Sequence, residues 1–150
     1  MSDWNYYQAN VNDRLASIYL DLEAKEEYSQ QEYPKLFWLF IRLKVARDDG
    51  LSHDDEFDAL CEYEDIIDEH IKGLPIHLVG RITTNGMRKF YFYGNDNFKF
   101  ETLVEAIVDG DSSYQYQSGS KDDSNWSQYD DVLYPEEQGL KQIFERAENA

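Results

Sequence analysis

The chain has little with which to cross-link itself or to cross a membrane. Its single cysteine, Cys61, excludes an internal disulfide framework and fits a reducing compartment. The longest apolar run, from Leu36 to Ile41, is too short to span a bilayer. The first residues, MSDWNYYQ, have neither the basic nor the apolar region of a signal peptide. We therefore expect a cytoplasmic protein that does not associate with a membrane.

Basic residues are scarce as well, with 14 Lys and Arg against 31 Asp and Glu and a net charge of −17. The deficit lies in two segments. Residues 48–72 hold eleven acids against one lysine, a charge of −10, and residues 109–137 hold eight acids against one lysine, a charge of −7. Two acidic regions of this kind repel DNA, RNA and anionic lipid, and they attract basic proteins or cations.

The chain does have enough hydrophobic sequence for a core, since 41% of its 150 residues are hydrophobic and 15% are aromatic. We therefore expect one folded acidic domain spanning residues 1–150. The predicted elements are a hairpin of residues 5–12 and 14–22, a strand at 35–45, a helix at 52–72, a hairpin of 75–84 and 87–94, a helix ending at Gly110, a strand at 112–120, an aromatic-anchored turn at 121–135 and a closing helix at 136–150.

From residue 35 onward the order is strand, helix, strand, strand, helix, strand, which is that of the split βαβ arrangement. The predicted fold class is therefore α+β: a ferredoxin-like βαββαβ sandwich with an added N-terminal β-hairpin and a short C-terminal helix. The apolar strand at 35–45 is expected to be central and covered on both faces. Ser52 with Asp55 predicts a capping box at the start of the first helix. Helical spacing predicts two buried stripes: Phe57, Leu60, Tyr63, Ile67, Ile71 and Leu74, and then Phe100, Leu103, Val104 and Ile107.

The four consecutive aromatics from Phe90 to Tyr93 allow two interpretations. In RNA-recognition domains with the split βαβ order, aromatics on the third strand stack on bases. Here Lys89 and Tyr91 stand where that pattern has small residues, and the segment LFWLFIRL does not complete a stacking platform. The negative net charge also opposes binding to phosphates. We favour a hairpin strand with Phe90 and Phe92 buried, and we rank single-stranded RNA binding third among the functions considered.

A row of carboxylates follows one side of the first predicted helix. Asp58, Glu62, Asp65 and Glu69 lie three or four residues apart, so their side chains stack along one face. Like charges at these spacings destabilise a helix by roughly 0.2–0.5 kcal/mol per pair, and no Lys or Arg interleaves before Lys72. A solvated face that keeps the protein soluble is the simplest interpretation. The alternative is a surface that docks on a basic partner.

Motifs for catalysis or for a cofactor are missing from the sequence. It contains no nucleophile elbow, phosphate-binding glycine loop or dinucleotide fingerprint. Its three histidines fall in no metal-ligand or catalytic-triad pattern. Cys61 lies beside the predicted buried stripe of its helix, which favours a buried, inert thiol. We expect no metal and no cofactor; whether the protein is an enzyme stays open, and no residue argues for one.

Several short motifs, taken in order, match a known family. They are Trp4 with Tyr6 and Tyr7, Asp49-Gly50-Leu51, Val79-Gly80-Arg81 with Thr83 and Gly86, the aromatics at 90–93, and Asp123, Trp126, Tyr129, Leu133 and Pro135. From Trp4 to about Pro135 the chain resembles the bacterial family catalogued as domain of unknown function 695. That resemblance implies no established reaction and no catalytic residues.

The segment from Asp123 to Tyr129 is also similar to an Asp-x-Trp-x-x-Tyr segment of regulator B of ribonuclease E activity, a small acidic inhibitor, although the acid here stands three residues before Trp126. This similarity implies a ribonuclease as one candidate partner.

The leading hypothesis is an interaction or regulatory protein that contacts a basic partner through its acidic helix and its acidic C-terminal segment. The candidate partner-binding residues are Asp58, Glu62, Asp65, Glu69, Asp122, Asp123, Trp126, Tyr129, Asp130 and Asp131. For the two aromatics, packing beneath the turn is the favoured alternative. The second hypothesis is a small-molecule-binding protein or enzyme with a pocket between the N-terminal hairpin and the central sheet. A homodimer through an unpaired sheet edge stays open, as does the edge that the hairpin joins.

Overall fold

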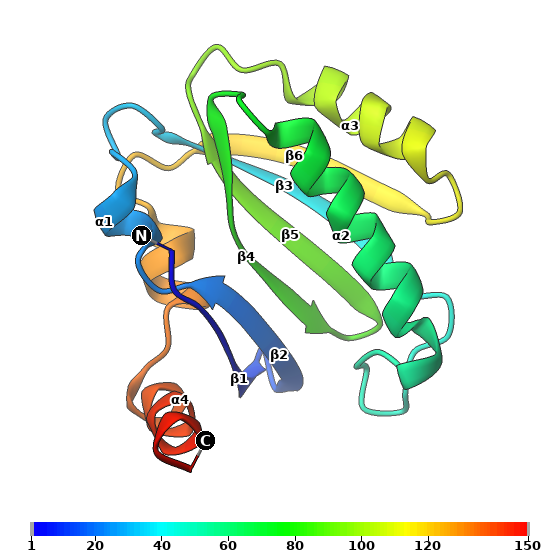
Figure 1. Ribbon diagram of the computed structural model, residues 1–150, viewed down its shortest axis with the longest axis vertical. Coiled ribbons are helices and arrows are strands. Elements are labelled where there is room, and N and C mark those ends of the chain that lie inside the picture. Colours follow the sequence, from blue (N-terminus) through cyan, green and yellow to red (C-terminus); the bar gives the residue numbers. More distant parts are fainter. Residues whose placement is uncertain (1, 150) are drawn as a thin grey trace.

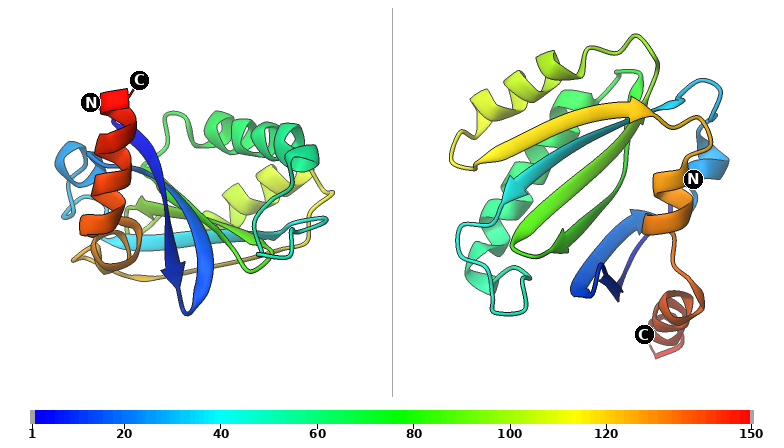
Figure 2. Two further views of the ribbon diagram at one scale, coloured as in Figure 1. Left: turned by 90° about the horizontal axis from the view of Figure 1, so that it is seen from below. Right: turned by 180° about the vertical axis from the view of Figure 1, so that it is seen from behind.

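The computed structural model describes residues 2–149 and is built on one six-stranded antiparallel sheet with strand order β1-β2-β4-β5-β3-β6 (Figure 1). Its elements are β1 (Trp4–Val11), β2 (Arg14–Asp21), α1 (Ala24–Glu27), β3 (Lys35–Arg42), the 3-10 turn η1 (Asp54–Glu56), α2 (Phe57–Ile71), β4 (Ile76–Thr84), β5 (Met87–Gly94), α3 (Phe100–Gly110), β6 (Tyr116–Asp122), the π-helical turn η2 (Tyr129–Leu133) and α4 (Glu137–Asn149). Helices α2 and α3 lie over one face of the sheet (Figure 2). The α+β prediction is confirmed.

The strands from β3 to β6 are ordered β4-β5-β3-β6, which is the order typical of the split βαβ arrangement. The N-terminal hairpin extends this sheet, because β2 pairs antiparallel with β4. Both hairpins turn through left-handed residues, with φ of 53° and 66° at Asn12 and Asp13, and of 50° and 78° at Asn85 and Gly86. Such values are required by two-residue type I′ loops. Because β1 and β6 stand at the two ends of the strand order, they are the edge strands of the sheet.

The core between the helices and the sheet is apolar and largely aromatic. Its buried members include Phe37, Leu39, Ile41, Phe90 and Phe92 of the sheet, Leu60, Tyr63 and Ile67 of α2, and Phe100, Leu103, Val104 and Ile107 of α3. The predicted inward positions of β5 and of α3 are thus confirmed.

Two residues of the predicted stripe on α2 lie outside this core, since Phe57 is 64% exposed and Leu74 is 40% exposed. The turn η1 precedes α2 and turns Glu56 inward in place of Phe57. The Glu56 carboxylate accepts a hydrogen bond from the Tyr114 hydroxyl (2.7 Å). Leu74 follows Gly73, whose φ of 77° ends the helix and redirects the chain.

The opposite face of the sheet is covered over only part of its width. The chain between β6 and α4 crosses this face and packs Trp126 and Tyr129 into a second core with β2, β4 and β5. No described helix covers the side of β3 and β6 that faces the viewer in Figure 2 (right). The predicted covering of β3 on both faces is therefore wrong: Leu36 is buried, but Trp38 and Phe40 on the same side are only half-buried.

The last helix, α4, covers the edge strand β1. Gln142 donates to the Gln8 carbonyl (3.0 Å) and accepts from the Gln8 amide (2.9 Å), as a neighbouring strand would. The Arg146 guanidinium lies over the Tyr6 ring, 3.7 Å from its centroid, and donates to the Tyr6 carbonyl. The β1 edge is therefore covered by α4, whereas no described strand pairs with the outer side of β6.

Candidate interaction surfaces

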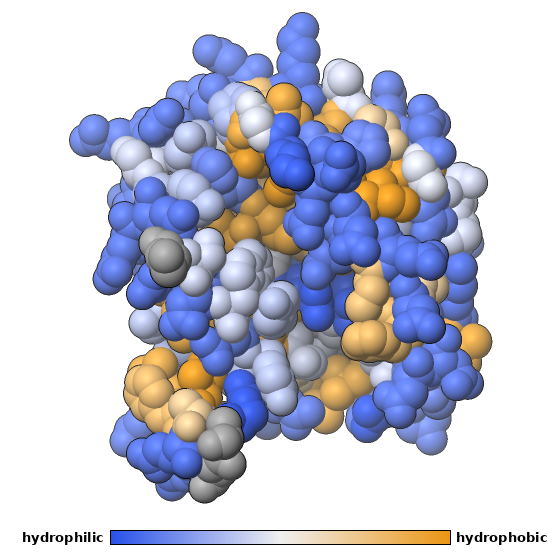
Figure 3. Space-filling model, viewed as in Figure 1, coloured by the Kyte–Doolittle hydropathy of each residue, from blue (hydrophilic) through white to orange (hydrophobic). Residues whose placement is uncertain are grey.

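The predicted row of carboxylates lies on the outer side of α2. Asp58, Glu62, Asp65 and Glu69 are all exposed, and mostly hydrophilic residues cover the solvent side of this helix (Figure 3). Within residues 2–149, none of the four carboxylates forms an ion pair with the chain itself. We call these four residues the acidic row. Its four charges thus have no counter-ion among the described residues.

The flank of α2 that faces β4 holds acids of a different kind. Glu64 forms an ion pair with Arg81, whose guanidinium also lies 4.5 Å from the centroid of the Tyr19 ring. Burial raises the pKa of Asp68, the charges of Glu64 and Asp65 raise it further, and Arg81 opposes them only in part. A raised pKa means that the ionised carboxylate is disfavoured at this position. The negative charges on α2 therefore act on one another, and they disfavour ionisation of Asp68.

Two further predictions about this helix are wrong. Cys61 is exposed rather than buried, because it lies about 100° around the helix from the buried Leu60. The capping box of Ser52 and Asp55 is replaced by a different start, in which His53 takes the N-cap position of η1 without a side-chain capping bond.

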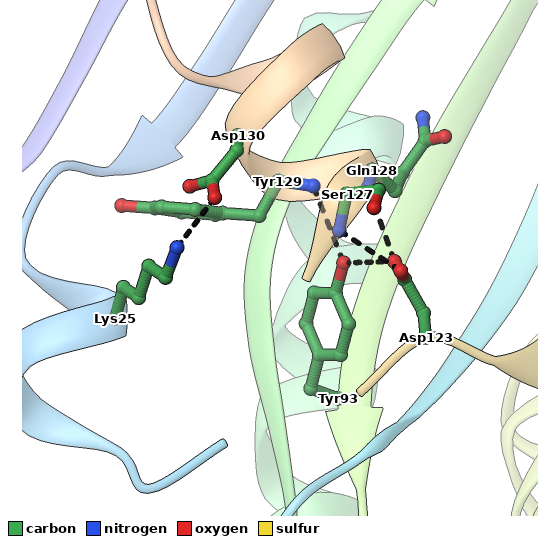
Figure 4. Close-up of polar contacts among 7 residues, drawn as sticks. All are labelled: Lys25, Tyr93, Asp123, Ser127, Gln128, Tyr129 and Asp130. Carbon is green, nitrogen blue, oxygen red and sulfur yellow. Dashed lines mark hydrogen bonds and ion pairs between the residues drawn. The ribbon is translucent and has the colours of Figure 1, made fainter. Parts of the chain in front are cut away.

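The acidic segment before α4 is built around Asp123, which is nearly buried. Its carboxylate accepts hydrogen bonds from the Tyr93 hydroxyl (2.8 Å), the Ser127 amide (2.9 Å) and the Gln128 amide (3.0 Å) (Figure 4). Burial alone would raise the pKa of Asp123, but these hydrogen bonds and the charge of Lys121 outweigh it and leave the pKa lowered. Asp123 thus caps the helical turn that follows, and its charge is used inside the fold.

Trp126 and Tyr129 fix this segment onto the sheet. Trp126 is fully buried, stacks on Tyr93 with ring centroids 4.1 Å apart, and donates from Nε1 to the Tyr33 carbonyl (2.9 Å). Its φ of 55° is in the left-handed region, which is uncommon for a bulky residue. The Tyr129 hydroxyl donates to the Asp21 carbonyl (2.6 Å). This packing agrees with the structural role that we favoured for both aromatics.

The structure divides the predicted partner-binding residues of this segment. Three have side chains inside the fold, where a partner has no access to them: Asp123, Trp126 and Tyr129. Asp122, Asp130 and Asp131 are exposed, and Asp130 forms an ion pair with Lys25 (Figure 4). The segment packs on the sheet face opposite α2, so the two acidic regions do not form one surface.

A cavity of about 500 Å³ opens between the N-terminal hairpin and the segment that leads into α4. Its lining combines apolar side chains of β1 and β2 with Tyr7, Asp131 and Glu136. Burial and the charge of Glu136 raise the pKa of Tyr7 to about 12, so its hydroxyl stays protonated at neutral pH and donates to the Leu133 carbonyl (2.6 Å). The prediction placed a pocket between the hairpin and the central sheet, whereas the second wall of this cavity is the C-terminal segment.

Comparison with known proteins places the chain in a family. Residues 2–134 match the model of DUF695, a family of unknown function. The chain belongs to the DUF695 family. No curated protein and no solved structure matches it significantly. The matched region ends before α4, so the helix that covers the β1 edge lies outside it.

Within its described residues, this DUF695 protein has no group of three or more His, Cys, Asp or Glu side chains placed to hold a metal ion. None of the described helices combines the length and the apolar character needed to cross a membrane.

One surface of this DUF695 protein was not expected from its sequence. Trp38 and Phe40 of β3 lie beside Lys89 and Tyr91 of β5, on the side of the sheet away from α2 and α3. The ring centroids of Trp38 and Phe40 are 6.3 Å apart, and the Lys89 amine lies 5.2 Å from that of Phe40. The available signal was the alternation along residues 36–42, because successive strand residues point to opposite faces.

Proposed function

We propose that this protein is a cytoplasmic interaction module, with a regulatory role, that binds a basic partner protein through the acidic row of α2. The observation that carries the proposal is the geometry of that row. Its four carboxylates are exposed along one side of a 15-residue helix and have no counter-ion among the described residues. From Asp58 to Glu69 the row extends about 16 Å along the helix axis. That length allows contact with several cations of one partner.

Solubility alone does not require charges to stand in a row. Some other acids of the chain form ion pairs, as Glu64 does with Arg81 and Asp130 with Lys25. An unpaired row of like charges destabilises its own helix. The same row attracts a basic surface over a distance and raises the rate of association with it. A docking function therefore supplies a reason for this arrangement that solubility does not.

The acidic row is also preorganised for binding. The opposite side of α2 is held by Leu60, Tyr63 and Ile67, which are almost completely buried against the sheet and α3. A surface on such an element loses little backbone freedom when a partner binds, so less of the interaction energy is offset by ordering.

A ribonuclease is the first partner class to test, because the segment from Asp123 to Tyr129 is similar to a segment of regulator B of ribonuclease E activity. The key side chains of that segment are buried here. The similarity therefore supports a related local fold, and we assign the contact itself to α2.

Capture from a lysate of the native host, with three forms of the protein as bait, tests the proposal. The first bait is the unchanged chain, and the second carries Glu62→Lys, Asp65→Lys and Glu69→Lys. The third is a matched control with the same change in net charge on α4: Glu137→Lys, Glu145→Lys and Glu148→Lys. We expect a basic protein to be retained at low salt by the first and third baits but not by the second, and to be released from the first and third baits at high salt. Equal retention by the second and third baits would contradict the proposal.

The cavity favours a second candidate function, the binding of a small cationic molecule. Its volume falls in the range of ordinary ligand sites, and Asp131 and Glu136 place two carboxylates in its lining. A panel of polyamines and other small cations should then raise the melting temperature of the protein. The rise should disappear in a variant with Asp131→Asn and Glu136→Gln; a rise that persists in this variant, or none in the unchanged protein, would exclude binding at this place.

A further inference from the structure

The uncovered part of the sheet has a composition unlike that of the chain as a whole. We call it the open face, and its outward residues are Trp38, Phe40 and Arg42 of β3, Lys89 of β5, and Gln117, Gly119 and Lys121 of β6. Three of these seven carry a positive charge and none is Asp or Glu, in a chain whose net charge is −17. An anionic ligand therefore meets three cations here, of which Lys121 also interacts with the buried Asp123 of the C-terminal segment.

Aromatic rings form the centre of the open face. The rings of Trp38 and Phe40 are stacked with an interplanar angle of 29°, and Phe40 and Tyr91 meet edge to face at a centroid distance of 5.7 Å. Gly119 on β6 leaves room for the indole, because a Cβ at this position would lie 2.7 Å from Cε2 of Trp38. Both Trp38 and Phe40 stay half-buried, so each ring keeps part of its surface for a ligand.

Cations surround these rings. Lys89 lies over Phe40, Lys121 pairs with Leu36 near one end of the β3–β6 ladder, and Arg42 follows Ile41, the last β3 residue of that ladder, at the other end. Beyond Phe40 the surface continues into a hollow of about 210 Å³ whose lining includes Arg42, Met87 and Gln117. The open face thus combines a pair of stacking surfaces with charges on both sides of them.

We propose that the open face binds single-stranded RNA, with two neighbouring bases on Trp38 and Phe40 and the phosphates near Lys89, Arg42 and Lys121. Stacking on aromatic side chains and neutralisation of phosphates by cations are the two interactions that hold single strands in general. Gln117 pairs with Phe40 across the β3–β6 ladder. Its exposed amide offers both a donor and an acceptor to a ribose 2′-hydroxyl, which distinguishes RNA from DNA.

The acidic row does not cancel this attraction. It lies on α2, on the other side of the sheet and of the helix-side core. At physiological salt, exposed charges separated by more than about 8 Å are largely screened from one another. The open face and the acidic row are thus separate surfaces, and the RNA proposal does not depend on the proposed protein partner.

Fluorescence anisotropy of a labelled eight-nucleotide single-stranded RNA, at about 50 mM salt, tests the proposal. We expect Trp38→Leu to weaken binding about tenfold or more, and Trp38→Phe to keep most of the affinity. The matched control is Tyr6→Leu, which removes an exposed aromatic of β1. With three phosphates neutralised, the affinity should fall about 20-fold between 50 and 200 mM salt. The double variant Arg42→Gln and Lys89→Gln should flatten this dependence, whereas Lys72→Gln with Lys99→Gln, on the helix side, should not.

Circular dichroism melts establish that each variant is folded. A second readout is quenching of Trp38 emission by the RNA in a Trp4→Phe background, where the remaining tryptophan, Trp126, is fully buried. Absence of binding by the unchanged protein, or equal affinity of Trp38→Leu and Tyr6→Leu, would overturn the proposal. Equal binding of the matching DNA strand would overturn the assignment to RNA, and equal binding of duplex RNA would overturn the role of stacking.

Discussion

Neutralising the acidic row should stabilise the protein. In a variant with Glu62→Gln, Asp65→Asn and Glu69→Gln, four repulsive contacts at i, i+3 or i, i+4 disappear: Asp58–Glu62, Glu62–Asp65, Asp65–Asp68 and Asp65–Glu69. At roughly 0.2–0.5 kcal/mol each, the gain is about 1–2 kcal/mol at low salt. Glu69 adds to it, because a negative charge in the last turn also opposes the helix dipole.

Urea unfolding at low salt and at about 1 M salt measures this gain. The free energy of unfolding should rise at low salt, and the difference from the unchanged protein should nearly vanish at high salt, where the screening length is about 3 Å. The matched control, with Glu137→Gln, Glu145→Gln and Glu148→Gln, removes the same charge from α4. No gain is expected there, since Glu145 lies 4.0 Å from Lys141 and Glu137 stands in the first turn of its helix.

The two variants together separate local repulsion from net charge. An equal gain in the free energy of unfolding of both variants would show that the lower net charge stabilises the fold, and not the loss of repulsion within the acidic row. A loss of stability in the α2 variant at low salt would refute the reasoning outright, because it would mean that the three replaced carboxylates have favourable partners.

Three further predictions concern other parts of the fold. The pKa of Asp123 is lowered from 3.8, so its ionised form stabilises the fold above that pH, and this contribution is lost as the pH falls through the lower folded value. The urea midpoint of Asp123→Asn should therefore lie below that of the unchanged protein at pH 7 and approach it in acid. A difference between the two midpoints that does not change with pH would contradict this. Tyr129→Phe leaves the Asp21 carbonyl without its donor and should lower the unfolding free energy by about 1–2 kcal/mol in the same assay, whereas no change would argue against anchoring. Cys61 is exposed and should react with a thiol reagent in the native protein; protection until unfolding would disprove its placement.

Local signals predicted most of the secondary structure. The dipeptides Asn12-Asp13 and Asn85-Gly86 both tolerate the left-handed backbone that a type I′ loop needs, and both hairpins form there. The period of α3 was equally clear, since Phe100 and Ile107 at helical spacing are buried as expected. These features depend on residues close together in the chain.

The start of α2 could not be predicted in this way. The turn of Glu56 toward the interior depends on the Tyr114 hydroxyl, which is 58 residues away in the chain. A carboxylate is normally placed outside when only its neighbours are considered, and Phe57 inside. A distant partner reversed both positions.

The candidate surfaces differ in the same respect. The acidic row could be predicted completely, because side chains three or four residues apart share a helix face whatever the rest of the chain does. The open face could not be predicted, although the sequence showed that Trp38 and Phe40 lie on the same side of their strand. Its exposure depends on how far the segment anchored by Trp126 extends across the sheet, and that extent is set by contacts with Tyr93 and Tyr33.

The most direct test of the docking function is the dissociation constant of the purified basic partner identified by capture. It should be measured for the unchanged protein, for the α2 charge-reversal variant and for the α4 charge-reversal variant, at two salt concentrations. Reversal of Glu62, Asp65 and Glu69 should weaken binding at least about tenfold at low salt, since three charge contacts become repulsive. The α4 variant should bind as the unchanged protein does. Equal dissociation constants for the two variants would contradict the assignment of the binding surface to α2.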